Sequence, residues 1–562
     1  MTRTLLTTGL IIVNKSFPGN KASLESQRNI AKGGYVHANG YMVGRVLDKA
    51  HSLDLKSAHP SQEINRYFPK ERPTKSRDFI ADFNIINNDI EIGYIRYKKY
   101  HKNITRAEYY LSKPKFAKMG YHGRIVLKNV QVKHFGDFNY MPTISTKQCA
   151  NVSSDAVLDN GRIIRAGMLD IYVDYVSFIQ YSLTYDFEVT DVVDLYTYPL
   201  ERAQDFPVNA VRTYAVTKEF YKLLEITIND TRHKLNLKAI NTIASDRARR
   251  LISEAKDWRE QAKIVNRFTR HEKRKLDSQY GINMQDPLKD YYKLVVEDED
   301  DDEENTIKFE KEETLFSEAA NRKHMTDYLF GCYVPIWTQL ELTCMTLIFY
   351  KKLPEAVVVY WDTDSLKIYG ETKENVKKVM EYCNDLYRKG AIEVRGECYL
   401  DLGTLTYEEE YDYFIAIGCK RYITMSDNYV KATLSGLMRA TEIYQEIYDQ
   451  CKSFPRLVST CFKINTRFTQ SATKGLESDY RQVGKTIIDK RAKKVKSGVV
   501  LVKQDYHLAK IVGDAKSQKL RKYYNEVYAL LFRNPQDLEL TTITRDEAGV
   551  YYVERNGVIE KI

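Results

Sequence analysis

Two acidic residues, Asp362 and Asp364, stand one residue apart within an apolar region. The valines at 357–359 predict a buried strand before them, and apolar residues at 366 and 368 predict a second strand after them. Side chains two positions apart in an extended chain share a face, so both carboxylates could point the same way. Adjacent like charges favour a divalent cation between them. A polar hairpin turn would explain a bare Asp-x-Asp, but Tyr-x-Asp-Thr-Asp-Ser after a valine run favours a metal site.

A third carboxylate, that of Asp54, is placed in a similar way. Leu53 and Leu55 flank it with the alternation of a strand, and Pro60 requires a turn or the start of a helix shortly afterwards. An acidic residue at the end of a buried strand can present its carboxylate and nearby backbone groups to a ligand. Capping of a helix by Asp54 or Ser57 explains the same pattern equally well.

Two adjacent glycines, Gly33 and Gly34, follow a polar segment that ends near residue 30 and is predicted to be helical. Paired glycines allow the backbone of another segment to approach closely, or they adopt a positive φ. A simple turn is the alternative interpretation.

The segment 234–281 is basic, contains no proline and is predicted to be helical. Arg270, Lys273, Asp277 and Tyr280 recur at intervals of three and four residues, so they share one helix face. That face would suit a triphosphate lying along the helix, with a base stacked on the terminal tyrosine. An exposed helix with salt bridges is the alternative.

Other basic regions lie on both sides of this helix. Residues 96–118 form a basic, tyrosine-rich patch that could line a nucleic-acid path or be a solvated face. Residues 413–423 are predicted to form one strand with Lys420 and Tyr422 on the same face. The lysines of 457–502, Lys494 and Lys496 among them, fit either a solvated surface or a DNA contact.

The composition fits a protein of several domains with a polyanionic partner. The chain has 562 residues, 43% of them hydrophobic, and a formal net charge of +10, so several cores are expected. Its eight cysteines form no Cys-x-x-Cys pair and indicate neither a zinc site nor a disulfide framework, which fits a reducing cytoplasm. No stretch reaches the roughly 18 apolar residues of a membrane span. We therefore predict a soluble intracellular protein without a membrane partner.

The remaining patterns predict individual elements. The acidic run 297–304 is predicted to be a solvated loop tip between two strands. The other predicted elements are strands at 123–132 and 191–198, an apolar segment at 326–350 beneath the Asp362 hairpin, an amphipathic helix at 375–389, a helix near 517–533, and a hairpin through Gly549 and Gly557.

Four motifs occur in a fixed order: Asp-x-x-Ser-x-x-Pro, Lys-x-x-x-Asp-Ser-x-Tyr-Gly, Tyr-x-Asp-Thr-Asp-Ser and Lys-x-Tyr. Together they resemble the polymerase module of family B DNA polymerases, most closely the protein-primed branch of bacteriophages and linear plasmids. The resemblance extends from about residue 33 to residue 502. It implies an α+β right-hand fold with an antiparallel palm sheet, helical fingers, a small thumb and the two insertions of that branch.

The resemblance also implies a division of the chain. The segments are 1–68 (N-terminal segment and first part of the palm), 69–233 (palm continuation with the insertion before the fingers), 234–282 (fingers helices), 283–320 (second insertion with the acidic loop), 321–424 (palm with the Asp-Thr-Asp hairpin), 425–503 (thumb) and 504–562 (C-terminal extension).

Individual residues receive roles by the same resemblance. Asp54 and Asp364 would be catalytic carboxylates holding two Mg²⁺ ions, or Mn²⁺ in their place, with Asp362 as a supporting catalytic carboxylate. The Leu55 carbonyl would also reach a metal. One ion would activate the primer hydroxyl, and the other would neutralise the triphosphate. Nucleotide binding is implied for Ser57, His59, Arg270, Lys273, Asp277 and Tyr280, and DNA binding for Gly33, Gly34, Thr363, Lys420, Tyr422, Lys494 and Lys496.

Three residues depart from the family pattern. His59 stands where a tyrosine usually blocks the 2′-hydroxyl of ribonucleotides, so weaker sugar discrimination is expected. Asp277 replaces the usual asparagine and should weaken dNTP binding unless Arg270 or Arg274 compensates. Ala31 replaces the tyrosine that usually precedes the two glycines.

The family's 3′–5′ exonuclease, with its Asp-x-Glu motif, would lie before the point at which this chain begins. We therefore expect a polymerase module without an intrinsic exonuclease, and leave open whether the exonuclease is a separate chain, is lost, or is missing because this is a fragment. The expected partners are primer-template DNA and dNTPs, with a priming protein and a separate exonuclease subunit as open alternatives.

We predict a template-directed DNA polymerase that extends a primer 3′ hydroxyl in phage, plasmid or mobile-element replication. The cytoplasm of a bacterial host is favoured over an organelle carrying a linear plasmid. A degenerate, non-catalytic subunit that binds DNA or a priming protein is the alternative, motivated by Ala31, His59 and Asp277. A reverse transcriptase fits less well, because that class has adjacent Asp residues, whereas Thr363 separates them here.

Overall fold

The structure is a computed structural model that describes four long stretches, 21–203, 328–435, 439–463 and 541–562. It also describes strands at 291–297, 306–312, 466–468, 492–495, 498–501 and 506–507 and a few single residues. Almost all of the predicted helical segment 234–281, and the predicted helix near 517–533, lie outside the described residues. The predicted mixture of helices and antiparallel sheets is confirmed.

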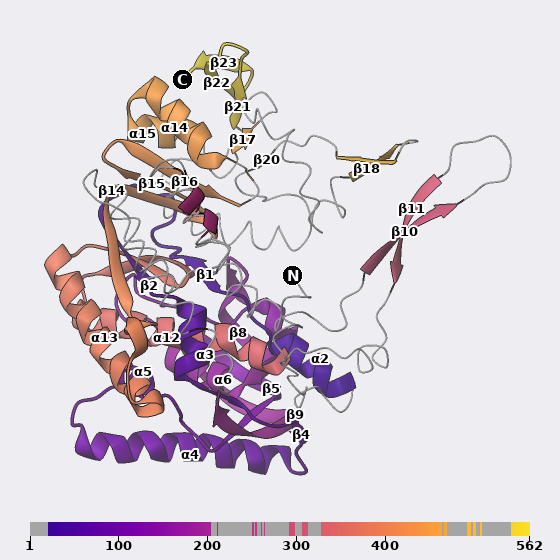
Figure 1. Cartoon of the computed structure of the whole chain (residues 1–562), viewed down its shortest axis with the longest axis vertical. Coiled ribbons are helices and arrows are strands. Elements are labelled where there is room, and N and C mark those ends of the chain that lie inside the picture. The colour runs from indigo at the N-terminus through magenta and orange to yellow at the C-terminus, as the bar shows by residue number, and fades with distance from the viewer. Residues whose placement is uncertain are drawn as a thin grey trace.

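A seven-stranded antiparallel sheet, here called the first sheet, joins segments that are far apart in the sequence (Figure 1). The predicted strands around residues 53–55 and 357–359, and the strand after the Asp-x-Asp turn, are all confirmed. In spatial order the strands are β1 (Tyr35–Ala38), β12 (Val357–Thr363), β13 (Ser365–Tyr369), β2 (Leu47–Leu55), β14 (Leu405–Gly418), β15 (Arg421–Ser426) and β16 (Tyr429–Leu434).

Helix α12 (Tyr328–Lys352) lies under this sheet and is buried on every side along residues 328–350, as expected for a helix that is apolar all round. The indole N–H of Trp361 on β12 donates to Thr346 Oγ1 of α12 at 3.1 Å. The predicted packing of the 326–350 segment beneath the hairpin is therefore confirmed. Two further helices, α3 (Ala58–Asn65) and α13 (Lys373–Arg395), also contact α12, and α13 includes the predicted amphipathic helix.

A second sheet of seven strands, here called the second sheet, is built mainly from one continuous part of the chain. Its strands include the predicted ones at 123–132 and 191–198. They are β3 (Tyr67–Pro69), β4 (Thr74–Lys75), β5 (Met119–Val132), β6 (Cys149–Val152), β7 (Val157–Asp159), β8 (Arg162–Asp174) and β9 (Tyr185–Arg202). The helices that contact it are α2 (Lys21–Ile30), which confirms the predicted N-terminal helix, α4 (Phe79–Tyr100), η1 (Thr146–Gln148) and α6 (Tyr175–Thr184). Helix α5 (Arg106–Ser112) packs mainly against α12 and α13.

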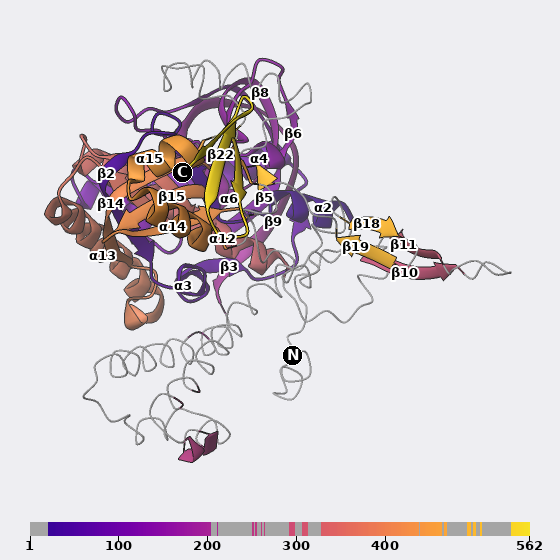
Figure 2. The same cartoon turned by 90° about the horizontal axis from the view of Figure 1, so that it is seen from above.

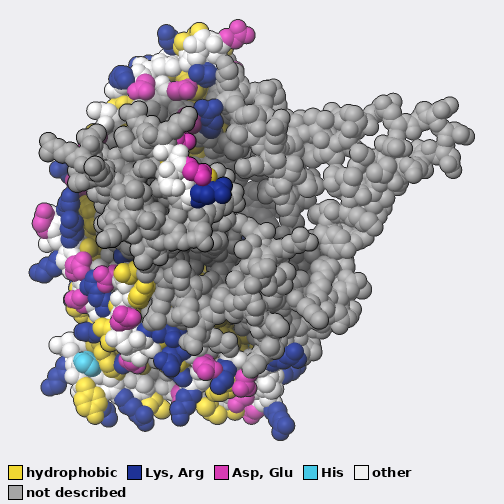
Figure 3. Space-filling model, in the orientation of Figure 1, with side chains coloured by type: hydrophobic (Ala, Val, Ile, Leu, Met, Phe, Trp, Pro, Cys, Tyr) yellow, Lys and Arg dark blue, Asp and Glu magenta, His cyan; other side chains and the backbone are white. Residues whose placement is uncertain are grey.

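The predicted basic patch at 96–118 includes the end of α4 and all of α5. Helix α4 lies at the end of the molecule opposite the C-terminus (Figure 1), where Lys and Arg side chains are interspersed with acidic and hydrophobic ones (Figure 3). Several cations of the patch already have partners. Arg106 forms a two-pronged ion pair with Glu91, and Lys113 Nζ lies 2.5 Å from Glu393 Oε2. These pairs favour the solvated-face interpretation over a nucleic-acid path.

The C-terminal strands pack on the helices α14 (Ala440–Cys451) and α15 (Phe454–Cys461). The region predicted to form one hairpin through Gly549 and Gly557 forms two, with one of the glycines in each turn, and both glycines have positive φ. The remaining elements are η2 (Tyr399–Asp401), β17 (Thr466–Phe468), β18 (Ala492–Val495), β19 (Gly498–Leu501), β20 (Tyr506–His507), β21 (Thr541–Arg545), β22 (Tyr551–Arg555) and β23 (Val558–Lys561).

Strands β10 (Tyr291–Glu297) and β11 (Thr306–Glu312) pair with each other and extend away from the first and second sheets (Figures 1 and 2). The prediction that the acidic run separates two strands is confirmed. No helix in the described part of the chain combines the length and apolar character needed to span a bilayer. The domain boundaries stay predictions.

Candidate functional site

The sheet register brings Asp54 and Asp364 to the same end of two neighbouring strands. Ser365 on β13 lies directly opposite Asp54 on β2. The backbone N–H of Leu55 donates to the carbonyl oxygen of Asp364 at 2.8 Å, and Thr406 Oγ1 on β14 donates to the Asp54 carbonyl at 3.1 Å. Two motifs that are remote in the sequence therefore meet through backbone pairing, which fixes their relative position more firmly than side-chain contacts alone.

The predicted hairpin at 362–364 is confirmed, but its local geometry differs from the extended chain that the spacing suggested. Thr363 has a φ of 65°, in the left-handed region that a β-branched residue rarely adopts. The Asp364 N–H donates to the Asp362 carbonyl at 2.7 Å. The chain is therefore not extended at Thr363, and the regular alternation of side chains is interrupted there. The prediction of an extended chain through the two aspartates is wrong.

The two hairpin carboxylates have different environments. Asp362 forms an ion pair with the ammonium of Lys420. Within the described residues, Asp364 has no hydrogen-bonding or ion-pairing side chain, and burial, followed by the charge of Asp362, raises the pKa of its carboxyl. A nearby cation would remove this cost. Asp364 therefore has the stronger electrostatic need for a metal ion.

The donor set fits a hard divalent cation that is shared with a phosphate ligand. Asp54 and Asp364 supply carboxylate oxygens, and Mg²⁺ is usually bound by one or two carboxylates together with substrate phosphates and water. No group of three or more His, Cys, Asp and Glu side chains that could hold a metal occurs in the described part of the chain. A complete protein cage is therefore absent from these residues, whereas a two-carboxylate site is compatible with them.

Lys420 and Tyr422 lie next to the hairpin, but they do not belong to one strand. The prediction of a continuous strand over 413–423 is wrong, because β14 ends at Gly418 and Lys420 occupies a turn with a φ of 56°. The Lys420 N–H donates to the hydroxyl of Tyr360 on β12 at 2.6 Å. The Tyr422 ring lies 4.9 Å from that of Tyr360. Both residues are thus fixed against the strand that leads to Asp362.

Gly34 lies against the hairpin turn. A Cβ atom added at Gly34 would come within 2.4 Å of Thr363 Cγ2, and Tyr35 pairs with Thr363 across the sheet. The carbonyl of Gly33 accepts a hydrogen bond from Gln339 Nε2 at 2.6 Å. The predicted close approach is therefore confirmed at Gly34, where a larger residue would displace the turn.

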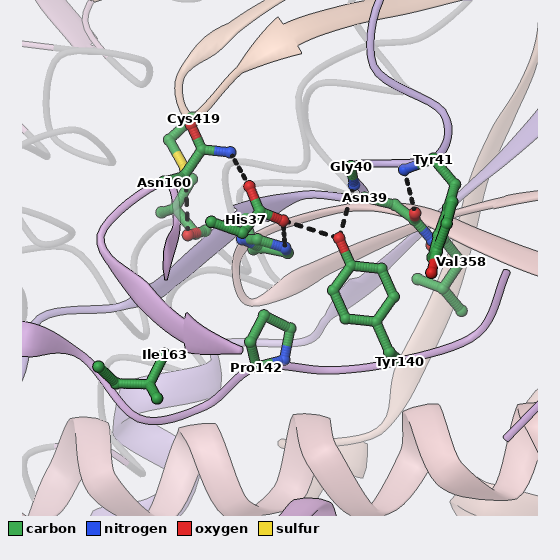
Figure 4. A network of polar contacts seen from close by, with 12 residues as sticks. His37, Asn39, Gly40, Tyr41, Tyr140, Pro142, Asn160, Ile163, Val358 and Cys419 are labelled. Atoms are coloured by element: carbon green, nitrogen blue, oxygen red, sulfur yellow. Dashed lines mark hydrogen bonds and ion pairs between the residues drawn. The ribbon is translucent and has the colours of Figure 1, made fainter. Parts of the chain in front are cut away.

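A buried polar network holds β1 in place (Figure 4). His37 Nε2 lies 3.2 Å from Asp159 Oδ2, and both side chains are almost completely buried. The Tyr140 hydroxyl donates to the same oxygen at 2.7 Å and accepts the N–H of Gly40 at 2.8 Å. Burial alone would favour neutral imidazole, but the charge of Asp159 prevails and raises the pKa of His37 to about 9. The network connects the first sheet to β7 of the second.

The predicted nucleotide-binding residues Ser57 and His59 lie at the start of α3. Ser57 is the residue before the helix, with a φ of 52°, and its carbonyl accepts the Ser61 N–H at 2.9 Å. Burial lowers the pKa of His59 to about 4, so its imidazole is neutral near pH 7. Arg270, Lys273, Asp277, Tyr280 and Lys496 lie outside the described residues, as does the side chain of Lys494 on β18.

Sequence reasoning missed three polar residues beside the carboxylates: Ser52, Lys367 and Glu408. Lys367 on β13 lies opposite Ser52 on β2, and its Nζ donates to Ser52 Oγ at 2.6 Å. Ser52 Oγ in turn donates to Glu408 Oε2 at 2.6 Å. The available signal was a lysine between the apolar residues Leu366 and Ile368, where strand alternation places it on the same face as Ser365.

No family model matches this sequence, and no curated protein is similar to it. Solved structures of Phi29 DNA polymerase are similar: the ternary complex with primer-template DNA and incoming nucleotide substrates, the post-translocation binary complex with primer-template DNA, and the complex with single-stranded DNA. Their TM-scores are 0.49, 0.47 and 0.48, each at 14% identity and covering 90% of this chain.

This chain spans 66% of the first Phi29 polymerase chain and 65% of the other two, slightly less than two thirds of their length. The identities are low and the TM-scores lie below 0.5. The interpretation of function therefore rests on the residues and strand register of the site.

Proposed function

We propose that this chain is the polymerase module of a DNA-directed DNA polymerase. The observation that carries the proposal is the register of β2 against β13, which sets Asp54 beside the Asp362-Thr363-Asp364 turn. This is the arrangement that the motif order implies for a palm. The first sheet would then be the palm, and the α14–α15 region with the C-terminal strands would belong to the thumb.

In this proposal the reaction joins the primer 3′ oxygen to the α-phosphorus of a dNTP, while the bond from that phosphorus to pyrophosphate breaks. Asp54 and Asp364 would hold Mg²⁺ or Mn²⁺, with the Leu55 carbonyl nearby. When bound, the ions supply charge neutralisation at the phosphates and lower the pKa of the primer hydroxyl. Asp362, paired with Lys420, would keep the lysine oriented toward the primer strand.

Other residues of the site would position the substrates. Gly34 and Thr363, which pack closely at the turn, would support the template and primer backbones there. His59 would lie near the sugar of the incoming nucleotide and, being smaller than a tyrosine, would leave room for a 2′-hydroxyl. The absence of proofreading and a bacterial host remain predictions.

Primer extension tests the proposal directly. With a labelled primer-template, dNTPs and Mg²⁺ or Mn²⁺, the wild type should extend the primer, and Asp364→Asn should lower the rate by about 10³-fold or more. Loss of a metal-binding carboxylate removes several kcal/mol of transition-state stabilisation, and about 4 kcal/mol corresponds to that factor. Fluorescence anisotropy of the same DNA should show that the variant still binds.

Asp412→Asn is the matched control. Asp412 is an exposed carboxylate on β14 that accepts the Asp427 N–H at 2.9 Å, and an asparagine oxygen can accept the same bond. Its rate should equal that of the wild type. Full activity in Asp364→Asn would refute the assignment of the carboxylate. A wild type that binds DNA but extends no primer would indicate the non-catalytic subunit instead.

A further inference from the structure

A lysine lies beneath the carboxylates on the same face of the first sheet. Lys367 on β13 pairs with Ser52 on β2, two positions along from the pairing of Ser365 with Asp54. Residues two apart on a strand share a face, so Lys367 follows Ser365 on the face that carries Asp54. Only 4% of Lys367 is exposed. A buried lysine is rare unless it has charged partners.

The ammonium group is held by a short relay of hydrogen bonds. Lys367 Nζ donates to Ser52 Oγ, which donates to Glu408 Oε2, and Nζ lies 3.8 Å from that same carboxylate oxygen. The side chain of Glu408 is 46% exposed, whereas that of Lys367 is 5% exposed. Water therefore screens the anion more than the cation, and a net positive field remains at the base of the site.

This field acts on the carboxylates that would hold the metal. Burial lowers the pKa of Lys367, and the charges of Glu408, Asp54 and Asp362 oppose that shift. The charge of Lys367 in turn acts on Asp364. One buried cation thus acts on the carboxylates of both motifs, whereas Lys420, which is 43% exposed, acts on the two hairpin carboxylates, Asp362 and Asp364.

We propose that Lys367 is a built-in counter-charge that keeps Asp54 and Asp364 together without metal and lowers their affinity for a divalent cation. This inference rests on the proposed function. The two carboxylates alone then bind the cation weakly. Full occupancy by metal requires the additional negative charge of the nucleotide triphosphate. Lys367 is thus a positioning residue that links metal binding to nucleotide binding.

The test is Mn²⁺ binding to the full chain without DNA or nucleotide, followed by the electron paramagnetic resonance signal of free Mn²⁺. Lys367→Met, which has similar length and no charge, should bind Mn²⁺ roughly threefold or more tightly, because a repulsive unit charge has been removed. Glu408→Gln should bind it more weakly, because the field of Lys367 is then uncompensated. The two variants have opposite expected signs.

Lys431→Met is the matched control, since Lys431 on β16 also acts on Lys367 but is exposed. Removing its screened charge should leave Mn²⁺ affinity unchanged. If Lys367→Met binds Mn²⁺ equally or more weakly while folded, as judged by circular dichroism, the inference is overturned. If that variant does not fold, unchanged or tighter binding in Glu408→Gln overturns the inference in the same way.

Asp364→Asn separates this inference from the proposed function. If Asp364→Asn loses Mn²⁺ binding but Lys367→Met binds Mn²⁺ no more tightly than the wild type, the role of Lys367 is refuted. The assignment of Asp364 as a metal ligand is then still supported. Equal Mn²⁺ binding by Asp364→Asn and the wild type would defeat the proposed metal site itself. Tighter Mn²⁺ binding by Lys367→Met, together with loss of Mn²⁺ binding in Asp364→Asn, supports both the role of Lys367 and the proposed metal site.

Discussion

His37 on β1 of the first sheet and His122 on β5 of the second are both fully buried, yet their pKa values are shifted in opposite directions. Asp159 raises the pKa of His37 to about 9 despite the burial of the ring. The His122 ring stacks with the rings of Tyr196 and Tyr198, whose centroids lie 5.3 and 5.6 Å away. Neither of its ring nitrogens has a hydrogen-bond partner in the described part of the chain, and burial lowers its pKa to about 3.

The difference follows from how the two sheets are assembled. The second sheet comes mainly from the continuous segment 119–202. It carries the buried carboxylates Asp159 and Asp174, but His122 packs against tyrosine rings and burial alone shifts its pKa. The first sheet joins segments more remote in the sequence, and each buried cation in it meets an anion from another segment: His37 meets Asp159, and Lys367 meets Glu408. The two buried cations of the first sheet thus have anionic partners, which His122 lacks, and Lys367 also acts on the carboxylates of the candidate site.

The largest expected effect concerns the His37–Asp159 pair. The pKa of His37 is raised above its unfolded value of 6.5, so the pair's contribution to stability is fully present below pH 6.5 and is lost as the pH rises through about 9. The pair contributes about 3 kcal/mol to the free energy of unfolding. Urea unfolding of the wild type should therefore show a stability loss of this size between pH 6.5 and pH 9.5, and His37→Gln should abolish it.

Two variants sharpen this prediction. Asp159→Asn should also abolish the alkaline loss, because the imidazole no longer has an anion beside it. Tyr140→Phe removes only the hydroxyl that donates to Asp159 and should keep the loss. An unchanged alkaline slope in both His37→Gln and Asp159→Asn would show that the first sheet does not retain a charged imidazole.

The local elements around the site were predictable because their sequence patterns are local. The valine run, the leucines around Asp54 and the alternation after Asp364 gave the strands that are observed. The end of β14 was not predictable from the apolar run around it. Lys420 lies in a turn with positive φ, which propensity disfavours, and the turn is held by the Tyr360 hydroxyl from another strand.

Partners that depend on strand register could not be derived from sequence patterns alone. Lys367 interrupts an apolar alternation, but its partners Ser52 and Glu408 lie on strands that only the folded sheet brings together. Asp159 likewise belongs to β7, and nothing in its local sequence indicates His37. The motif order predicted that Asp54 and Asp364 would meet, whereas the counter-charges beneath and beside them became visible only with the register.

His122 should give the opposite pH dependence in the second sheet. The pKa of His122 is lowered below its unfolded value of 6.5. Between pH 6.5 and pH 3 the unfolded chain therefore binds a proton at this residue and the folded chain does not, so stability falls as the pH falls. The stability lost by pH 5 is about 2 kcal/mol. His122→Phe should remove that loss in urea unfolding at pH 5 and pH 7, and it should leave the alkaline slope of His37 unchanged. A wild type without this acidic loss would show that His122 finds an anionic partner.

The smallest expected effect lies at the contact between β1 and the hairpin turn. Gly34→Ala would bring its Cβ to 2.4 Å from Thr363 Cγ2, so it should cost about 1–2 kcal/mol in urea unfolding. Thr363→Gly removes the collision and the left-handed strain of a β-branched residue, so the same Gly34→Ala change should cost at least about 1 kcal/mol less in that background.

Gly33→Ala is the matched control for this cycle, because a Cβ there has no atom within 4 Å. It should cost less than Gly34→Ala and show no coupling to Thr363. Equal costs at the two glycines would mean that the turn moves freely away from β1. Coupling confined to Gly34 would mean that the backbone of β1 fixes the Asp362-Thr363-Asp364 turn. The carboxylates would then be positioned by both neighbours of the β12–β13 hairpin, β1 on one side and β2 on the other.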